Sequence, residues 1–232
     1  MRKSTQNLSF LLGVLLLAFT SCSDDDLGGG TGVDPDPVDS ELVGSIDNDM
    51  TLDASIDYNL TGVLSVEPGA TLTIPAGTTI NTAIGTDVYI VVQQGAMIDI
   101  QGTADDPVIM NSTSGSAGSW GGLVIAGNAV STDGVDLTAE VGGIVYGGDE
   151  PTDNSGSISY LILSDAGASI NSESQYNGLS LYTVGSETTI DNVAILNGAD
   201  DGVEFFGGSV FATNLYLENN EDDAVDWTEG WD

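Results

Sequence analysis

The sequence TIDNVAILNGADDGVEF, residues 189–205, is repeated in degenerate form 22 positions later. Polar corner residues correspond in the two copies: Asn192 with Asn214, Asn197 with Asn219, Asp200-Asp201 with Asp222-Asp223, and Gly208 with Gly230. Apolar positions correspond as well: Val193 with Leu215, Ile195 with Leu217, Val203 with Val225, and Phe205 with Trp227. A fixed period in the low twenties, with short alternating runs and Gly, Asn and Asp corners, is typical of a β-solenoid. We therefore expect these residues to form stacked coils.

The same style of sequence continues towards the N-terminus. Val63–Ile80 and Val88–Thr103 are built from short runs with period-2 alternation that are separated by glycine corners. The pattern loosens over Ser131–Ser157 and again over Ala168–Tyr176. We expect these two segments to be loops that leave a coil and return to it.

The charge distribution excludes several classes of partner. The chain has 36 acidic residues, no histidine, and only two basic residues, Arg2 and Lys3. Nucleic acids and anionic membrane surfaces are bound through Lys and Arg, so neither is expected as a partner. No side-chain salt bridge can form beyond Lys3, and a net charge of −34 favours bound cations.

The N-terminus has the pattern of an export signal. Arg2 and Lys3 precede an apolar run, Leu8–Phe19, whose 12 residues are too few to span a bilayer as a helix. We therefore expect residues 1–21 to be a signal peptide. Cys22, the only cysteine, follows two small residues in an arrangement that resembles a bacterial lipobox. The resemblance implies a lipid on Cys22, whereas the alternative is an incidental thiol in a secreted protein.

An acidic segment follows the cysteine. Ser23–Asp26 resembles the tag that directs Bacteroidota lipoproteins to the outer face of the outer membrane. The alternative is a solvated acidic spacer. We expect residues 22–41 to be a lipidated, flexible tether, and the protein to be anchored by lipid in the cell outer membrane and exposed on the surface.

Four motifs carry a wider resemblance: GATLTI (69–74), GTADDPVI (102–109), SWGGLVIAGNA (119–129) and GADDGVEFFGG (198–208). They resemble a family of Bacteroidota surface lipoproteins with a right-handed parallel β-helix. The resemblance implies a fold and a location but no established reaction. We therefore expect an all-β protein with a single-stranded right-handed parallel β-helix over residues 42–232. Because the sequence stops inside a copy of the coil, we expect a fragment or a missing C-terminal cap.

The repeated acidic residues are candidate metal ligands. Equivalent residues of successive coils lie about 4.8 Å apart, which places Asp200 and Asp201 beside Asp222 and Asp223, and Glu204 beside Asp226. Two like charges at that distance repel by about 1 kcal/mol in water and about 3–4 kcal/mol at an effective dielectric constant near 20. Ca²⁺, which prefers oxygen ligands, would remove this repulsion. The alternative is a set of solvated carboxylates at a corner.

An enzymatic interpretation uses the same residues. An inverting glycosidase needs two carboxylates about 6.5–9.5 Å apart, and Asp200, Asp201, Asp222 or Glu204 are candidates. The Asp200-Asp201 pair resembles the paired aspartates of polygalacturonases, but those enzymes also use His and basic residues. We therefore expect no catalytic residues and a role in binding or adhesion to a neutral glycan, a peptide or a surface partner, assisted by cations. The alternative function is polysaccharide hydrolysis.

Asparagines and aromatic residues have structural interpretations. The repeated asparagines are expected to stack as ladders of hydrogen-bonded amides. Phe205 and Trp227 occupy apolar positions of the repeat and are expected in the core. Four other aromatic residues lie near glycine-rich turns and are either core residues, which we prefer, or exposed rings for stacking on sugars: Trp120, Tyr146, Tyr176 and Trp231.

Overall fold

The computed structural model describes residues 40–172 and 174–232. The expected signal peptide, Cys22 and the tether up to residue 39 lie outside these described residues. All regular elements in the described ranges are strands. In the same ranges, no helix has the length and apolarity that a membrane crossing requires.

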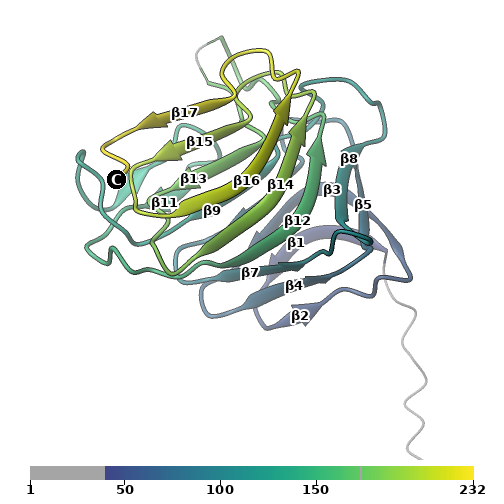
Figure 1. Cartoon of the computed structure of the whole chain (residues 1–232), viewed down its shortest axis with the longest axis horizontal. Coiled ribbons are helices and arrows are strands. Elements are labelled where there is room, and N and C mark those ends of the chain that lie inside the picture. Colours follow the sequence, from purple (N-terminus) through teal and green to yellow (C-terminus); the bar gives the residue numbers. More distant parts are fainter. Residues whose placement is uncertain (1–39, 173) are drawn as a thin grey trace, which may run out of the picture. The chain divides into compact units, whose positions relative to one another are not determined.

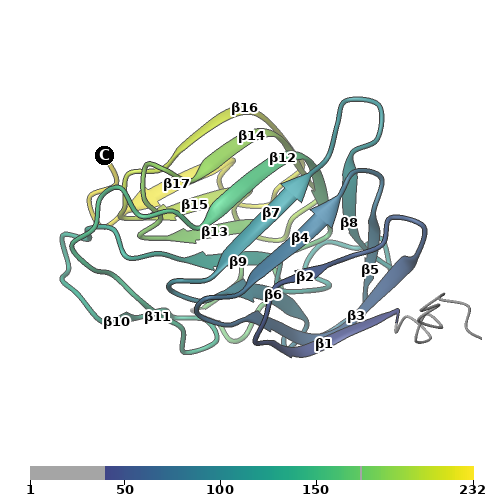
Figure 2. The same cartoon turned by 90° about the horizontal axis from the view of Figure 1, so that it is seen from below.

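The strands form a parallel β-helix with three faces per coil (Figures 1 and 2). Face 1 contains β2 (Met50–Thr51), β4 (Thr71–Pro75), β7 (Met97–Gln101) and the first halves of the long strands β12 (Gly156–Ser164), β14 (Thr189–Leu196) and β16 (Phe211–Glu218). Face 2 contains the first half of β3 (Asp57–Val66), β5 (Thr79–Thr82), β8 (Val108–Ser112) and the second halves of β12, β14 and β16.

Face 3 completes each coil. It contains the second half of β3, then β6 (Tyr89–Val92), β9 (Leu123–Ala126), β13 (Leu179–Tyr182), β15 (Val203–Phe206) and β17 (Val225–Thr228), with β1 (Glu41–Ile46) alongside β3. All these pairings are parallel, and together the strands form one 15-stranded sheet.

The strand register confirms the 22-residue repeat. Val193 pairs with Leu215 on face 2, and Val203 pairs with Val225 on face 3. The same spacing relates β2 to β4, where Met50 pairs with Leu72. Residues that correspond in the sequence repeat therefore lie on adjacent strands.

The asparagines of the repeat turn the backbone rather than forming amide ladders. Asn192 and Asn214 bend β14 and β16 between faces 1 and 2 with φ of 56° and 53°, a left-handed conformation that asparagine tolerates better than most residues. Both amides donate hydrogen bonds to Asp191, at 2.7 Å, and the Asn197 amide donates to Asp165, also at 2.7 Å. The prediction of amide ladders was therefore wrong, because aspartate carboxylates are the partners.

The core fills the interior of the coils. The predicted apolar positions Val193, Ile195, Val203 and Phe205 are buried in it. Trp227 is 60 % exposed, which contradicts its predicted core position. Within residues 40–172 and 174–232, β17 is the last strand in the sheet order, and no further described strand pairs with it.

A different aromatic residue covers Phe205. The ring of Trp231 stacks on it with a centroid distance of 4.3 Å. Trp231 also donates its indole N–H to the Val210 carbonyl at 3.0 Å. The interior at this end of the coils is therefore closed by Trp231 rather than by Trp227.

Face 3 carries a second apolar layer on its outer side. All four residues of β6, β9, β13 and β15 are buried, because the segment after β9 and the loop before β13 pack over them. The segment after β9 contains an antiparallel hairpin, β10 (Leu137–Thr138) and β11 (Val145–Tyr146), which the prediction of a plain loop missed. The rings of Tyr146, Tyr182 and Phe206 pack in series, and the core interpretation of Trp120, Tyr146 and Tyr176 is confirmed.

Candidate functional site

Five carboxylates of the last two coils meet where face 2 leads into face 3. We call them the acidic corner: Asp200, Asp201, Glu204, Asp222 and Asp226. They form two overlapping groups, Asp200–Asp201–Asp222 and Asp201–Glu204–Asp226, and within each group the carboxylate oxygens lie within 4.8 Å of one another. Asp201 belongs to both groups and is therefore the centre of the cluster.

The repeat explains why these residues converge. Glu204 and Asp226 are register partners on β15 and β17, so their side chains are neighbours. The loops that precede these strands stack closely at Gly202, where a Cβ atom would lie 2.7 Å from the Ala224 carbonyl oxygen. Such contact excludes any larger residue, so Gly202 brings the aspartates of one coil against those of the next.

Asp223 is the one predicted ligand that does not join the cluster. Its backbone N–H donates to the Asp201 carboxylate at 2.8 Å, whereas its own side chain is exposed and belongs to neither group. The structure thus brings together five of the six predicted residues. Metal binding by them stays a prediction.

The sequence analysis missed a buried amide beside the cluster. Asn177 is 2 % exposed and donates to a carboxylate oxygen of Glu204 at 2.7 Å. Its own amide oxygen is buried and has no hydrogen-bond partner. Asn177 lies in the loop before β13, where the 22-residue repeat is interrupted, so no periodic signal pointed to it.

Burial dominates the electrostatics of the acidic corner. It raises the pKa of Glu204 to about 8, and the nearby Asp201 and Asp226 carboxylates add to this effect, whereas the hydrogen bond from Asn177 opposes it. Burial also raises the pKa of Asp201 to about 6. The pKa of Asp200 is raised as well, again chiefly by burial. Glu204 therefore holds its proton at neutral pH.

Two cavities flank the acidic corner and share Glu140, a residue of the hairpin segment whose pKa is raised by burial and by Asp200. The smaller cavity, about 230 Å³, is lined by Glu140, Ser172, Gln175, Asp200 and Asp222. The larger, about 320 Å³, is lined by Thr138, Glu140, Tyr146, Tyr182, Glu204, Phe206 and Glu229. The corner is therefore accessible from two sides.

The donor atoms suit a hard cation. Ca²⁺ binds oxygen ligands at about 2.3–2.6 Å, so two ligands of one ion are at most about 5 Å apart. The spacing of 4.8 Å within each group meets this limit. Asp200, Asp201 and Asp222 in one group, and Asp201, Glu204 and Asp226 in the other, are thus the residues that fit a bound ion.

Comparison with known proteins supports the fold. A family model described as a pectate-lyase like beta helix domain matches residues 44–232. No curated protein and no solved structure gives a significant match. The family match runs from β1 through β17 and includes the whole acidic corner. Strand topology and family match agree, and the chain belongs to the pectate-lyase-like β-helix family.

Proposed function

We propose that the protein is a non-catalytic, cation-assisted binding protein for glycans or for a surface partner. The observation that carries this proposal is the acidic corner, where five carboxylates converge and the buried amide of Asn177 donates a hydrogen bond to one of them, Glu204. The family match fits a binding role and also a polysaccharide-cleaving one. The absence of basic residues beyond Lys3 supports the binding role.

A cation would neutralise the carboxylates of the acidic corner that remain ionised, because the sequence beyond Lys3 offers no basic side chain to pair with them. Arg2 and Lys3 are the only basic residues of the sequence, and both precede the expected cleavage site. Each ionised pair at coil spacing is destabilised by about 3–4 kcal/mol at an effective dielectric constant near 20. A divalent ion would convert this repulsion into attraction and would join the last two coils.

Several features favour binding over catalysis. β-Helix lyases commonly use Arg or Lys as the base, and the sequence beyond Lys3 contains neither. The net charge of −34 repels anionic polymers, so neutral glycans are the preferred ligands. A lipid on Cys22, followed by the acidic segment Ser23–Asp26, would present the β-helix at the surface of the outer membrane.

Calcium is expected to stabilise the protein through Asp201. At a Ca²⁺ concentration 100 times the dissociation constant, the free energy of unfolding should increase by about 2.7 kcal/mol. Replacement of Asp201 by Asn should abolish this gain, because Asp201 belongs to both carboxylate groups. Melting curves with Ca²⁺ and with EDTA, together with calorimetric titration, measure the effect.

Asp223→Asn is the matched control, since this exposed neighbour lies outside both groups. It should keep the response to Ca²⁺. The proposal is wrong if wild-type protein shows neither heat nor a melting shift with Ca²⁺, or if the two variants lose the response equally. NaCl at equal ionic strength separates specific binding from screening.

A second candidate function, polysaccharide hydrolysis, is favoured by one observation. Glu204, with its pKa raised to about 8, is protonated at neutral pH and lies beside Asp201, whose pKa is about 6. This pairing of an acid with a carboxylate is the requirement for glycoside hydrolysis. The oxygens of the two groups lie within 4.8 Å, which is shorter than the expected inverting spacing and closer to the retaining one of about 5–5.5 Å.

An assay for reducing ends separates the two functions. The hydrolase predicts that neutral polysaccharides are cleaved and that Glu204→Gln lowers the rate by at least about 100-fold, the typical contribution of a general acid. The binding protein predicts retention on a glycan array without any release of reducing ends. Cleavage that persists in both Glu204→Gln and Asp201→Asn would contradict the assignment of these residues.

A further inference from the structure

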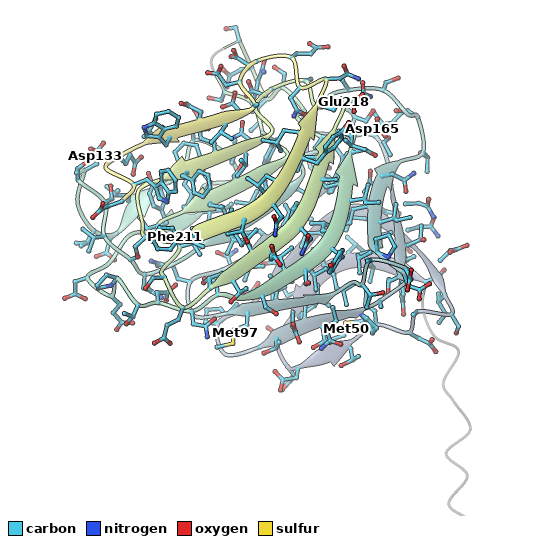
Figure 3. All side chains as sticks on the ribbon, in the orientation of Figure 1. Met50, Met97, Asp133, Asp165, Phe211 and Glu218 are labelled. Carbon is cyan, nitrogen blue, oxygen red and sulfur yellow. The ribbon has the colours of Figure 1, made fainter. Side chains whose placement is uncertain are left out.

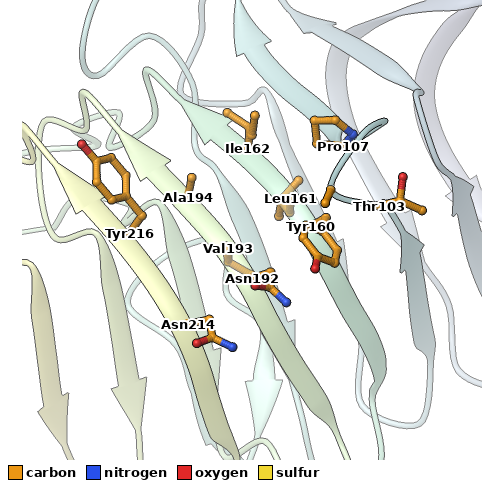
Figure 4. Close-up of a pocket in the computed structure, with 11 residues that line it drawn as sticks. Thr103, Pro107, Tyr160, Leu161, Ile162, Asn192, Val193, Ala194, Asn214 and Tyr216 are labelled. Carbon is orange, nitrogen blue, oxygen red and sulfur yellow. The ribbon is translucent and has the colours of Figure 1, made fainter.

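We infer that a second site, on the outside of the corner between faces 1 and 2, binds a neutral sugar ring. The inference rests on the proposed glycan-binding role but uses residues outside the acidic corner. We call this site the tyrosine pocket; Figure 4 shows it. Its lining residues come from four strands or their adjoining loops, and those that matter for recognition are Tyr160, Ile162, Asn192, Ala194, Asn214 and Tyr216.

The pocket exists because a small residue separates two large ones. Ile162, Ala194 and Tyr216 are register partners on β12, β14 and β16, and they form one outward row. Neighbouring strands are about 4.8 Å apart, so the backbones at Ile162 and Tyr216 are separated by about 10 Å. The Tyr216 ring lies along its own strand towards Glu218, which leaves the space above Ala194 open. Ala194 forms the floor between them, as Figure 4 shows. The gap has the width of a pyranose ring with its contact distances.

The walls offer the groups that recognise sugars. The ring of Tyr216 is 59 % exposed, and its hydroxyl donates to Glu218, which holds the ring in place. Tyr160 forms part of the opposite wall. Aromatic rings of this kind pack on the apolar faces of sugars while keeping a polar edge in water. An exposed, oriented tyrosine beside an alanine floor is therefore a stacking platform.

Two amides line the bend of the same pocket. Asn192 and Asn214 each donate to Asp191, at 2.7 Å, and this fixes the orientation of their side chains. Their amide oxygens remain as acceptors for sugar hydroxyls. The two residues lie on adjacent strands, so the acceptors repeat at coil spacing. This arrangement combines stacking with a few oriented polar groups, as small-molecule sites do.

Volume and charge define the ligand. The cavity measures about 300 Å³, at the lower end of the range for small-molecule sites, and suits one or two sugar rings. Two charged groups, Asp191 and Glu218, contact lining residues, and both are acidic. A uronic acid or a sulfated sugar would be repelled by both carboxylates. The ligand class is therefore a neutral hexose or pentose unit of a polysaccharide.

Two variants test the pocket from opposite directions. Tyr216→Ala removes the stacking ring, and Ala194→Leu fills the floor. Each should weaken binding to neutral polysaccharides at least 10-fold. Phe211→Ala is the matched control, because Phe211 is an aromatic residue of the same strand, is 65 % exposed and lies outside the pocket; Figure 3 labels it at the opposite end of β16 from Glu218. It should bind as wild type.

The probes are soluble xyloglucan, galactomannan and mixed-linkage β-glucan, with polygalacturonate as the anionic comparison. Affinity electrophoresis and calorimetry are run on full-length protein in EDTA, so that the tyrosine pocket is measured without cations. The expected result is binding of at least one neutral polymer in EDTA that both pocket variants weaken and that Phe211→Ala leaves unchanged. Melting curves verify that each variant is folded.

Other outcomes overturn the inference and remain distinguishable from failure of the proposed function. In one such outcome, binding of neutral glycans requires Ca²⁺ and Asp201 and is unchanged in Tyr216→Ala and Ala194→Leu. This result would reject the tyrosine pocket and keep the cation-assisted function. A preference for polygalacturonate rejects the neutral ligand. If the pocket variants instead dissociate a dimer in sedimentation velocity and no polymer binds, the surface contacts a second copy of this chain. Absence of binding to every polymer, with or without Ca²⁺, rejects the pocket and glycan binding together.

Discussion

Replacing Trp120 by alanine is expected to lower the free energy of unfolding by about 3–5 kcal/mol. Trp120 is 0 % exposed and belongs to the interior core. Its indole N–H donates to the Ser164 carbonyl at 2.8 Å. The substitution would leave a cavity too large for the surrounding strands to fill, and it would remove the partner of a carbonyl at the end of β12. Urea denaturation followed by circular dichroism measures the change.

Trp227→Ala provides the comparison. It removes the same number of atoms from a side chain that is 60 % exposed, so the loss of stability should stay within about 0.5 kcal/mol. The difference between the two variants tests whether the Trp120 side chain is buried and the Trp227 side chain is exposed. Equal losses in the two variants would show that the burial of Trp120 is misassigned.

Raising the pH from 5 to 9 in EDTA is expected to destabilise the protein, and Glu204 should be the main cause. In the folded state the pKa of Glu204 is raised from 4.5 to about 8. Between these values the folded state binds more protons than the unfolded state, so stability falls as the pH rises. The loss begins above the unfolded pKa and is complete above pH 8. Asp201, raised from 3.8 to about 6, contributes at lower pH.

Glu204→Gln should remove the part of this loss that Glu204 causes, which develops between about pH 4.5 and 8 and dominates above pH 6. Glutamine keeps the shape of the neutral carboxyl group and cannot ionise. At pH 9 the variant should therefore be more stable than wild type by at least about 1.4 kcal/mol, the free energy of one pKa unit. Glu150→Gln, in an exposed loop, serves as control and should retain the wild-type slope. A wild-type profile that is flat from pH 6 to 9 would contradict the buried, protonated state of Glu204.

The sequence repeat predicted the part of the fold that is periodic. Residues 22 apart in the last two coils pair on adjacent strands, which is why the acidic corner could be anticipated from Asp200, Asp201 and Glu204. Regular stacking also placed Val193 and Ile195 in the core. Where successive coils have equal length, residues one repeat apart in the sequence become neighbours on adjacent strands.

Residues outside the repeat could not be predicted in this way. Asn177 and Glu140 reach the acidic corner from two inserted segments whose paths depend on tertiary packing, not on a period. The predicted burial of Trp227 was wrong because a periodic pattern does not reveal which of the described strands is last in the sheet order. The predicted amide ladder at Asn192 was wrong for another reason. The sequence shows an asparagine that recurs after 22 residues, and both a backbone bend and a stack of amides would produce such a recurrence.

The unequal lengths of the coils allow the surface to diversify while the interior is retained. Ile98 and Gly156 are register partners although 58 residues separate them, whereas Thr189 and Phe211 are separated by 22. Closing the longer excursion costs only about 0.9 kcal/mol more in chain entropy, because this term grows with the logarithm of length. The segment between β9 and β12 can therefore be lengthened or replaced during evolution at a small cost in folding free energy. The surface formed by this segment can change while the strands beneath it keep their pairing.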